Sequence, residues 1–158
     1  MTNELSNIYQ RHVKMVYRIC FTYMKNSHDT EDAVADTFVK ALKNPPAFKS
    51  EEHEKAWLIR AAGSVCKDSL KGRWRQHEDL SDYADSLQAA PAFETDDVSE
   101  AVMELPQRYR LVIYLYYYEG YNCKQIAGML RKPHSTIRNY LHEAREILRK
   151  VLGEDYER

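Results

Sequence analysis

Apolar residues recur every three or four positions along almost the whole chain, and this spacing places them on one face of an α-helix. The stripe is clearest in the first half, where it runs Ala33, Val34, Thr37, Phe38, Ala41 and Leu42. Glycine and proline, five of each, are too few for a fold rich in loops or short strands. The spacing therefore predicts an all-α fold.

The first half of the chain is expected to form three helices. The first runs from about Leu5 to Met24, and the polar residues 26–28 interrupt its pattern. The second holds the stripe above and ends at the prolines that follow Asn44. The third begins after Ser50, a suitable N-cap, and ends in a basic cluster near residue 75.

Charge is strongly segregated, although the net charge of the whole chain is only −1. Residues 79–104 hold eight acidic side chains and no Lys or Arg, so the remainder of the chain carries +7. Such like-charged stretches usually stay solvated and mobile. The sequence therefore predicts two small helical domains, residues 1–76 and 98–153, joined by an acidic flexible linker at 77–97.

The second half carries several signals of helix ends. Pro106 suits the first position of a helix, and Gly120 suits the position just after one. Asn122 with Gln125 three residues later resembles a capping box, and Gly153 closes the last helix. A short helix, a turn and a longer helix between residues 122 and 148 predict a helix-turn-helix.

The outward side of this helix-turn-helix has side chains suited to DNA. Arg can bind guanine edges, Asn can bind adenine, and Ser or Thr hydroxyls can contact phosphates. The expected reader residues are His134, Ser135, Thr136, Arg138, Asn139 and His142, with Lys124, Arg131 and Lys132 against phosphates. The alternative is an amphipathic helical hairpin with a solvated polar face.

A second candidate is the helix expected between residues 57 and 75, which carries two tryptophans and has a basic end. Aromatic rings stack on unpaired bases, and basic side chains hold the strand. Trp57 is expected in the core, whereas Trp74, between Arg73 and Arg75, fits either a base contact or a cover over an apolar edge.

Other functional classes find little support. The chain has no Gly-rich phosphate loop, no His-Glu metal motif and no nucleophile setting, so no enzyme activity, cofactor or metal is expected. The three cysteines are widely spaced and are expected to be reduced and mostly buried. Without a signal region or an apolar span, the protein is expected in the cytoplasm, with no membrane insertion.

Four motifs in order resemble the extracytoplasmic-function group of bacterial sigma factors, the promoter-specificity subunits of RNA polymerase. Residues 29–38 (DTEDAVADTF) resemble the conserved helix of region two, and Phe48 with 56–62 (AWLIRAA) resembles its promoter-melting segment. Residues 105–110 (LPQRYR) resemble the start of region four. Three further segments resemble the DNA-reading part of region four: 125–127 (QIA), 135–138 (STIR) and 141–145 (LHEAR).

The resemblance implies a role for each part of the chain. The first domain would bind core RNA polymerase and recognise and melt the −10 element, and the second would read the −35 element, chiefly through Arg138, Asn139 and His142. The linker would lie along a basic channel of the polymerase as a polyanion mimic. An anti-sigma factor is a further expected partner. Polymerase contacts would fall on Asp32, Ala35, Asp36 and Phe38, and −10 contacts on Arg60, Ser64, Lys67, Lys71, Arg73, Trp74 and Arg75.

At four positions the chain departs from the pattern of the family. Ser64 stands where many relatives have Asn. This position is expected to lie in the loop that binds a flipped promoter base. Ala35 replaces a common Gln, Arg131 replaces a turn Gly, and Glu143 replaces a base-facing Arg of some relatives.

Three rival functions remain at this stage. A stand-alone helix-turn-helix regulator would bind its operator without polymerase, usually as a dimer. A protein-interaction module would show no salt-dependent DNA binding. An enzyme is the third and has the weakest support.

Overall fold

The computed structural model describes residues 2–43, 47–75 and 97–153, and within these ranges every regular element is a helix. The helices form two compact units, here called the N-terminal unit (α1–α3) and the C-terminal unit (α4–α7). The prediction of an all-α protein with two helical domains is therefore confirmed. The predicted linker lies outside the described residues, except for Asp97, at which a helix begins.

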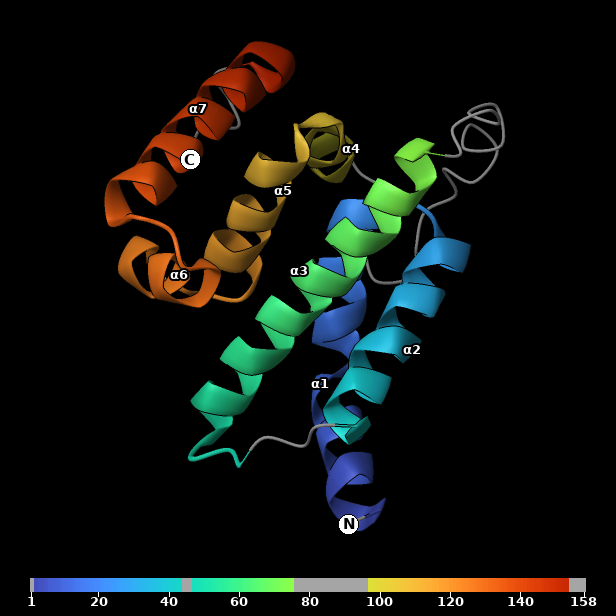
Figure 1. The fold of residues 1–158 in the computed structure, drawn as a ribbon. Coiled ribbons are helices and arrows are strands. Elements are labelled where there is room, and N and C mark those ends of the chain that lie inside the picture. The colour runs from blue at the N-terminus through green and yellow to red at the C-terminus, as the bar shows by residue number, and fades with distance from the viewer. Residues whose placement is uncertain (1, 44–46, 76–96, 154–158) are drawn as a thin grey trace. The chain divides into compact units, whose positions relative to one another are not determined.

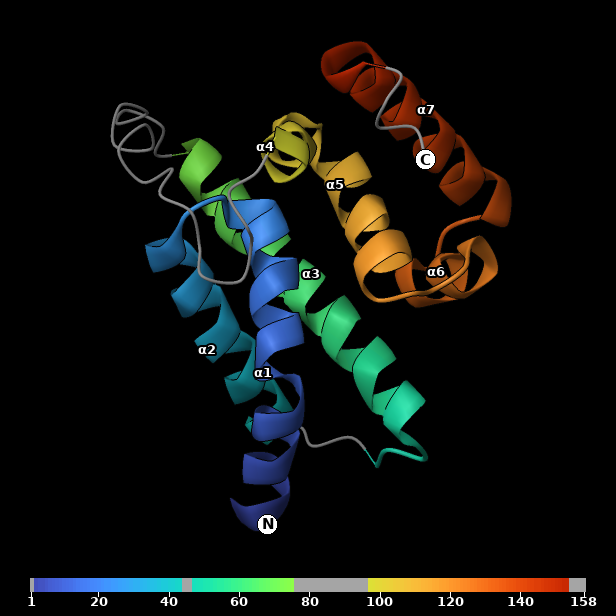
Figure 2. The same ribbon diagram turned by 180° about the vertical axis from the view of Figure 1, so that it is seen from behind.

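Three helices make up the N-terminal unit: α1 (Thr2–Met24), α2 (Ser27–Lys43) and α3 (Glu51–Arg75). Each packs on the other two, and Figure 1 and Figure 2, seen from opposite sides, show α1 against both α2 and α3. The apolar stripes meet between them. The most buried side chains include Val16, Ile19, Cys20, Leu58, Ala62 and Cys66.

Side chains that cap the helices explain where α2 and α3 begin. The Asn26 Oδ1 atom accepts a hydrogen bond of 2.8 Å from the Asp29 N–H, and the Ser50 Oγ atom accepts one of 3.1 Å from the His53 N–H. The sequence predicted the interruptions before α2 and before α3, and the predicted cap at Ser50 is confirmed.

A buried carboxylate ties α1 to α3. Glu54 is only 7% exposed. Its two oxygens accept hydrogen bonds of 2.9 and 3.0 Å from the Arg11 Nη2 atom, and its Oε1 atom lies 2.6 Å from the Nε2 atom of buried His12. Burial alone would raise the pKa of Glu54, but the bonds to Arg11 and His12 outweigh it and lower the pKa. The carboxylate is therefore held in its charged form.

Two of the three cysteines also meet in this core. Cys20 and Cys66 are reduced and fully buried, whereas Cys123 is half-buried, as the sequence predicted for the set. The neighbouring Cys20 thiol and burial raise the pKa of Cys66. A thiol that stays protonated is a poor nucleophile, so Cys66 serves as a packing residue.

The C-terminal unit contains α4 (Asp97–Glu104), α5 (Gln107–Ile113), the π-helix η2 (Tyr114–Tyr118), α6 (Cys123–Leu130) and α7 (His134–Leu152). Helix α7 packs on α4, α5 and α6. The core of the C-terminal unit contains Leu105, Val112, Leu115, Ile126, Ile137, Leu141 and Ala144.

Three details of this unit differ from the expectation. No separate helix was expected before Pro106, but α4 forms there, with Ala101 and Val102 buried although their neighbours are acidic. Pro106 is the N-cap of α5 and not its first helical residue, so the helix begins one residue later than predicted. The helix before Gly120 was expected to be regular, but it widens into η2 at Tyr114.

None of the described helices has the length and apolar character that a membrane crossing requires.

Candidate nucleic-acid interfaces

Capping interactions hold the start of α6, and backbone interactions hold the turn that follows it. Asn122 and Gln125 form the predicted capping box: each side chain accepts a hydrogen bond from the other residue's backbone N–H, at 2.8 and 2.9 Å. Arg131 adopts the left-handed conformation, with φ 55°, and the Lys132 N–H donates to the Ala127 carbonyl at 3.0 Å. Arg131 thus occupies the backbone conformation that a turn glycine normally supplies.

Packing between α6 and α7 leaves one side of the reader helix exposed. Ile126, Ile137 and Leu141 are buried and form the contact between the two helices. Leu130, which was expected to face inward, is half-buried. Because these residues fill the inner face, the polar residues between them point outward.

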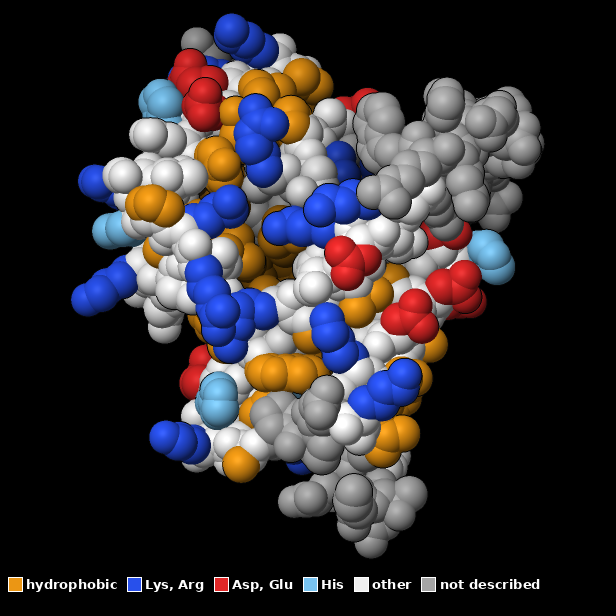
Figure 3. Space-filling view, in the orientation of Figure 1, with side chains coloured by type: hydrophobic (Ala, Val, Ile, Leu, Met, Phe, Trp, Pro, Cys, Tyr) orange, Lys and Arg blue, Asp and Glu red, His pale blue; other side chains and the backbone are white. Residues whose placement is uncertain are grey.

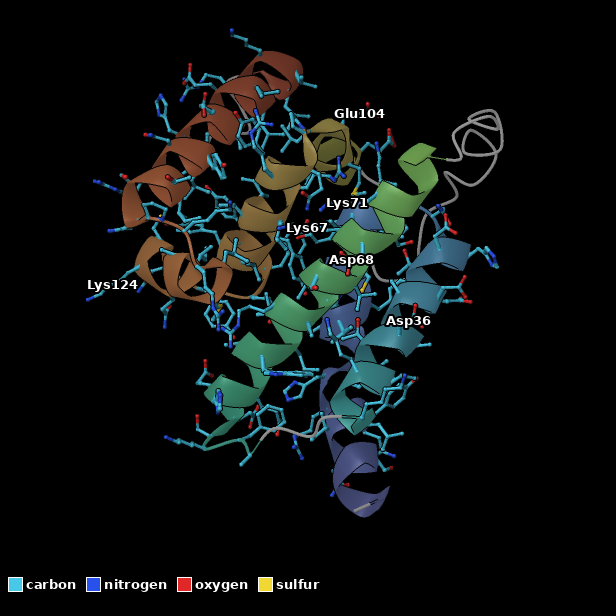
Figure 4. The ribbon with its side chains drawn as sticks, in the orientation of Figure 1. Asp36, Lys67, Asp68, Lys71, Glu104 and Lys124 are labelled. Atoms are coloured by element: carbon cyan, nitrogen blue, oxygen red, sulfur yellow. The ribbon has the colours of Figure 1, made fainter. Side chains whose placement is uncertain are left out.

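The structure brings the predicted reader residues together at the α6–α7 turn and on the first half of α7. Thr136 is half-buried, and the other eight are exposed: Lys124, Arg131, Lys132, His134, Ser135, Arg138, Asn139 and His142. Figure 3 shows Lys, Arg and His side chains along the outer surface of α6 and α7, and Figure 4 labels Lys124 at the outer edge.

This surface is basic because its sequence contains no acid. Residues 120–142 hold four Lys or Arg and no Asp or Glu, which gives a charge of +4. The next acid is Glu143, which is exposed. A patch of this charge suits a phosphate backbone.

Helix α3 presents the second candidate interface. Ser64, Lys67 and Lys71 are exposed at spacings of three and four residues, and Arg60 is half-buried one turn earlier. Figure 4 shows Lys67 and Lys71 along α3, with Asp68 beside them. The predicted contacts Arg73, Trp74 and Arg75 belong to the last turn of α3, but their side chains lie outside the described residues.

The expected position of Ser64 in a loop is wrong. Ser64 lies near the middle of α3, where its Oγ atom accepts a hydrogen bond of 3.4 Å from the Lys40 Nζ atom of α2. The helix continues through this segment because the flanking Ala62 and Cys66 are buried and keep the helical spacing. Ser64 therefore offers its hydroxyl from a helix surface.

The aromatic residues before this surface form a small cluster. Trp57 was expected in the core but is half-buried, and its ring meets Phe48 edge-on at 5.9 Å. Phe48 also meets His53 edge-on at 5.5 Å. The cluster fixes the start of α3 and leaves part of each ring accessible.

The outer side of α2 holds most of the expected polymerase contacts. Asp32, Ala35 and Asp36 are exposed, and Figure 4 labels Asp36 on α2. Phe38 is buried and meets Tyr9 edge-on at 4.9 Å, so it packs inside the unit and is unavailable for a direct contact in this structure.

Two apolar residues of α2 were assigned incorrectly or overlooked. Leu42 was counted in the buried stripe but is 50% exposed, and Val39 is 45% exposed. Their spacing places them beside Ala35 and Asp36, so the outer surface of α2 is partly apolar. The apolar spacing gave no sign that these two side chains are exposed, and by spacing alone Leu42 belongs to the buried stripe.

One group in the described residues has the composition of a metal site. Ligand atoms of His28, Asp29 and Asp32 lie within 4.8 Å of one another. The Asp29 carboxylate already accepts a 2.8 Å hydrogen bond from Asn26 Nδ2, and His28 and Asp32 are exposed. This arrangement is explained by the helix N-terminus, which attracts acids.

Together, these features define a helix-turn-helix DNA-binding protein built from two helical units. Solved sigma factors share this fold at low sequence identity. The sigma factor RpoE, solved with the anti-sigma factor NepR from Bartonella quintana, aligns with a TM-score of 0.77 at 22% identity, covering 98% of this chain and 97% of that one. CnrH, solved with the cytosolic domain of CnrY, aligns with a TM-score of 0.68 at 20% identity, covering 98% and 91%.

Sequence comparison identifies the family. The family model of Sigma-70 region 2 matches residues 8–76, and that of Sigma-70 region 4 matches residues 95–156. The ECF RNA polymerase sigma factor SigW of Bacillus subtilis is 27% identical over 87% of this chain and 82% of its own length, and SigV of the same organism is 28% identical over 91% and 88%. The chain belongs to the sigma-70 family, in its ECF group. The resemblance seen in the sequence is thereby confirmed.

Proposed function

We propose that this sigma factor binds core RNA polymerase, directs it to particular promoters and helps to open the DNA, with each step carried by one exposed helix surface. The observation that carries this proposal is that the outer sides of α2, α3 and α7 stay unpacked within their units and hold side chains suited to those tasks. Membership of the sigma-70 family supports this function over that of a stand-alone helix-turn-helix regulator.

The proposed polymerase contact is the outer side of α2. Asp32 and Asp36 offer carboxylates to basic groups, and Ala35 with the exposed Val39 offers an apolar strip between them. Interfaces combine a central apolar patch with polar groups at its rim, which is the composition found here.

The proposed −10 contact is α3. Promoter opening needs no bond cleavage: a base that leaves the stack is held outside it, which offsets an unstacking cost of a few kcal/mol. Ser64 can hydrogen-bond a base edge, and Arg60, Lys67 and Lys71 can bind strand phosphates. We retain Arg73, Trp74 and Arg75 as further contacts on sequence grounds.

The proposed −35 contact is the reader surface of α7. Arg138, Asn139 and His142 would read base edges, while Ser135 and Thr136 would contact the backbone. Lys124, Arg131, Lys132 and His134 surround them and would fix the position of the helix on the duplex.

We further assign residues 1–76 to region two, 77–97 to the acidic linker and 98–153 to region four. The linker's seven acids and lack of Lys or Arg suit a channel that otherwise holds RNA. We expect the protein to act in the cytoplasm beside the polymerase, to carry no catalytic chemistry of its own and to be restrained by an anti-sigma factor.

Replacing Arg138 with alanine should weaken promoter binding by about 1–3 kcal/mol and relax the preference at one base pair of the −35 element. A bidentate Arg contact discriminates one base pair, so its loss should make the four base pairs at that position nearly equivalent. Binding of polymerase with the variant would be measured on duplexes that vary each −35 position in turn.

The control is Lys150→Ala, which removes a cation from the last turn of the same helix. It should leave the base preference unchanged. Equal weakening by Arg138→Ala on every duplex would instead make Arg138 a phosphate contact and would contradict its proposed role as a base reader.

A further inference from the structure

The π-helix η2 places two tyrosines against the reader helix. The Tyr117 hydroxyl accepts a hydrogen bond of 2.8 Å from the Arg145 Nε atom of α7. The Arg145 guanidinium lies 5.4 Å from the ring centre of Tyr116 and 5.7 Å from that of Tyr117. Because a π-helix has a wider turn than an α-helix, these consecutive tyrosines both reach one arginine. The side chain of Arg145 is thereby fixed in direction.

Arg145 lies on the same side of α7 as the proposed base reader. It follows Arg138 by seven residues, which is close to two full turns and about 10 Å along the helix axis. A reader helix contacts base edges with its first turns, and its later turns approach the backbone that borders the groove. Arg145 is therefore at the right distance to meet a phosphate of the same DNA site.

The charge of Arg145 is not neutralised locally. Within the described ranges it has no carboxylate at ion-pair distance, whereas Arg149, one turn later, pairs with Glu146. Arg145 remains exposed, and Tyr117 beside it is 56% exposed. A pre-oriented, exposed cation next to a DNA-reading surface is what a phosphate contact requires.

We propose that Arg145, oriented by Tyr116 and Tyr117, binds a backbone phosphate of the −35 duplex, so that η2 is part of the DNA interface. This inference rests on the proposed function of α7. It extends the contact surface beyond the nine residues predicted from the sequence. It also gives the π-helix a functional role, which π-helices frequently have.

The test compares the salt dependence of DNA binding for Arg145→Gln, Tyr117→Phe and the unchanged full chain, each with core polymerase, on a duplex selected from a random pool. Arg145→Gln should bind roughly tenfold more weakly, and the slope of log K against log salt should fall by about 0.9, because one released counterion is lost. The weakening should be the same for duplexes altered at single −35 positions.

Tyr117→Phe keeps the ring and the charge but removes the hydroxyl. It should bind about threefold more weakly, with the salt slope unchanged, because the cation remains but is less well oriented. Lys150→Gln is the matched control: it removes one positive charge from α7 without touching η2 and should change the slope much less than Arg145→Gln.

A purely structural role for the cluster would give a different result. Arg145→Gln would then lower the thermal unfolding midpoint of the chain and leave the salt slope equal to that of the control, and the proposal would be overturned. Weakening confined to one base pair would overturn it as well. Failure of the unchanged chain to bind core polymerase would instead show that the proposed function is wrong, so the two failures are distinguishable.

Discussion

Replacing Glu54 with alanine should lower the free energy of unfolding of the N-terminal unit by about 3 kcal/mol, the lower end of the range for one partner of a buried ion pair. The loss leaves buried His12 without its carboxylate, whereas Arg11 is 45% exposed and can turn to water. Both tryptophans of the chain belong to this unit, so urea unfolding followed by tryptophan fluorescence measures its stability directly.

The pH dependence supplies a second readout of the same variant. The folded state lowers the pKa of Glu54, so its stabilisation is present above the unfolded pKa and is lost as pH falls through the folded pKa. The unchanged chain should therefore lose stability below about pH 4.5, and Glu54→Ala should lose less over that range. Glu51→Ala, an exposed acid in the first turn of α3, is the control and should cost no more than about 0.5 kcal/mol. Equal losses from the two variants would refute the assigned role of Glu54.

Replacing Lys67 and Lys71 together with glutamine should reduce promoter opening roughly a hundredfold, because each charge-assisted phosphate contact contributes about tenfold. Both lysines are exposed and lie one turn apart on α3. Permanganate reactivity of unpaired thymines near the −10 element, measured with core polymerase, would follow the open state.

Lys14→Gln with Lys150→Gln is the matched control, since it removes two exposed lysines outside the proposed −10 surface. Opening should then stay within a few-fold of the unchanged chain, because the residues proposed to contact polymerase, the −10 element and the −35 element are all unchanged. Full thymine reactivity in the Lys67 and Lys71 variant would remove α3 from the opening step.

The sequence predicted the features that depend on local interactions. The capping box at Asn122 and the cap at Ser50 each involve residues three apart, so a short stretch of sequence was sufficient to identify them. The apolar spacing in α6 and α7 likewise predicted which side packs inward, and the reader residues followed as its exposed complement.

Features that depend on distant contacts were missed. Leu42 is exposed although it continues the stripe of α2, whereas Phe38 of the same stripe is buried against Tyr9 of α1 and is not free for the expected polymerase contact. The π-helix at Tyr114 and the contact of Tyr117 with Arg145, 28 residues away, depend on how α7 packs, which no local spacing encodes. No sequence signal marked Glu54, whose pairing with α1 appears only in the folded unit.

The dependence of DNA binding on polymerase tests the central claim most directly. A gel shift would compare the purified full chain, with and without bacterial core RNA polymerase, on duplexes selected from a random pool. Our account predicts that the chain alone binds weakly and without sequence preference at moderate salt, and that core polymerase produces a sequence-specific complex with melted DNA. Specific binding by the chain alone, unchanged when core polymerase is added, would contradict it.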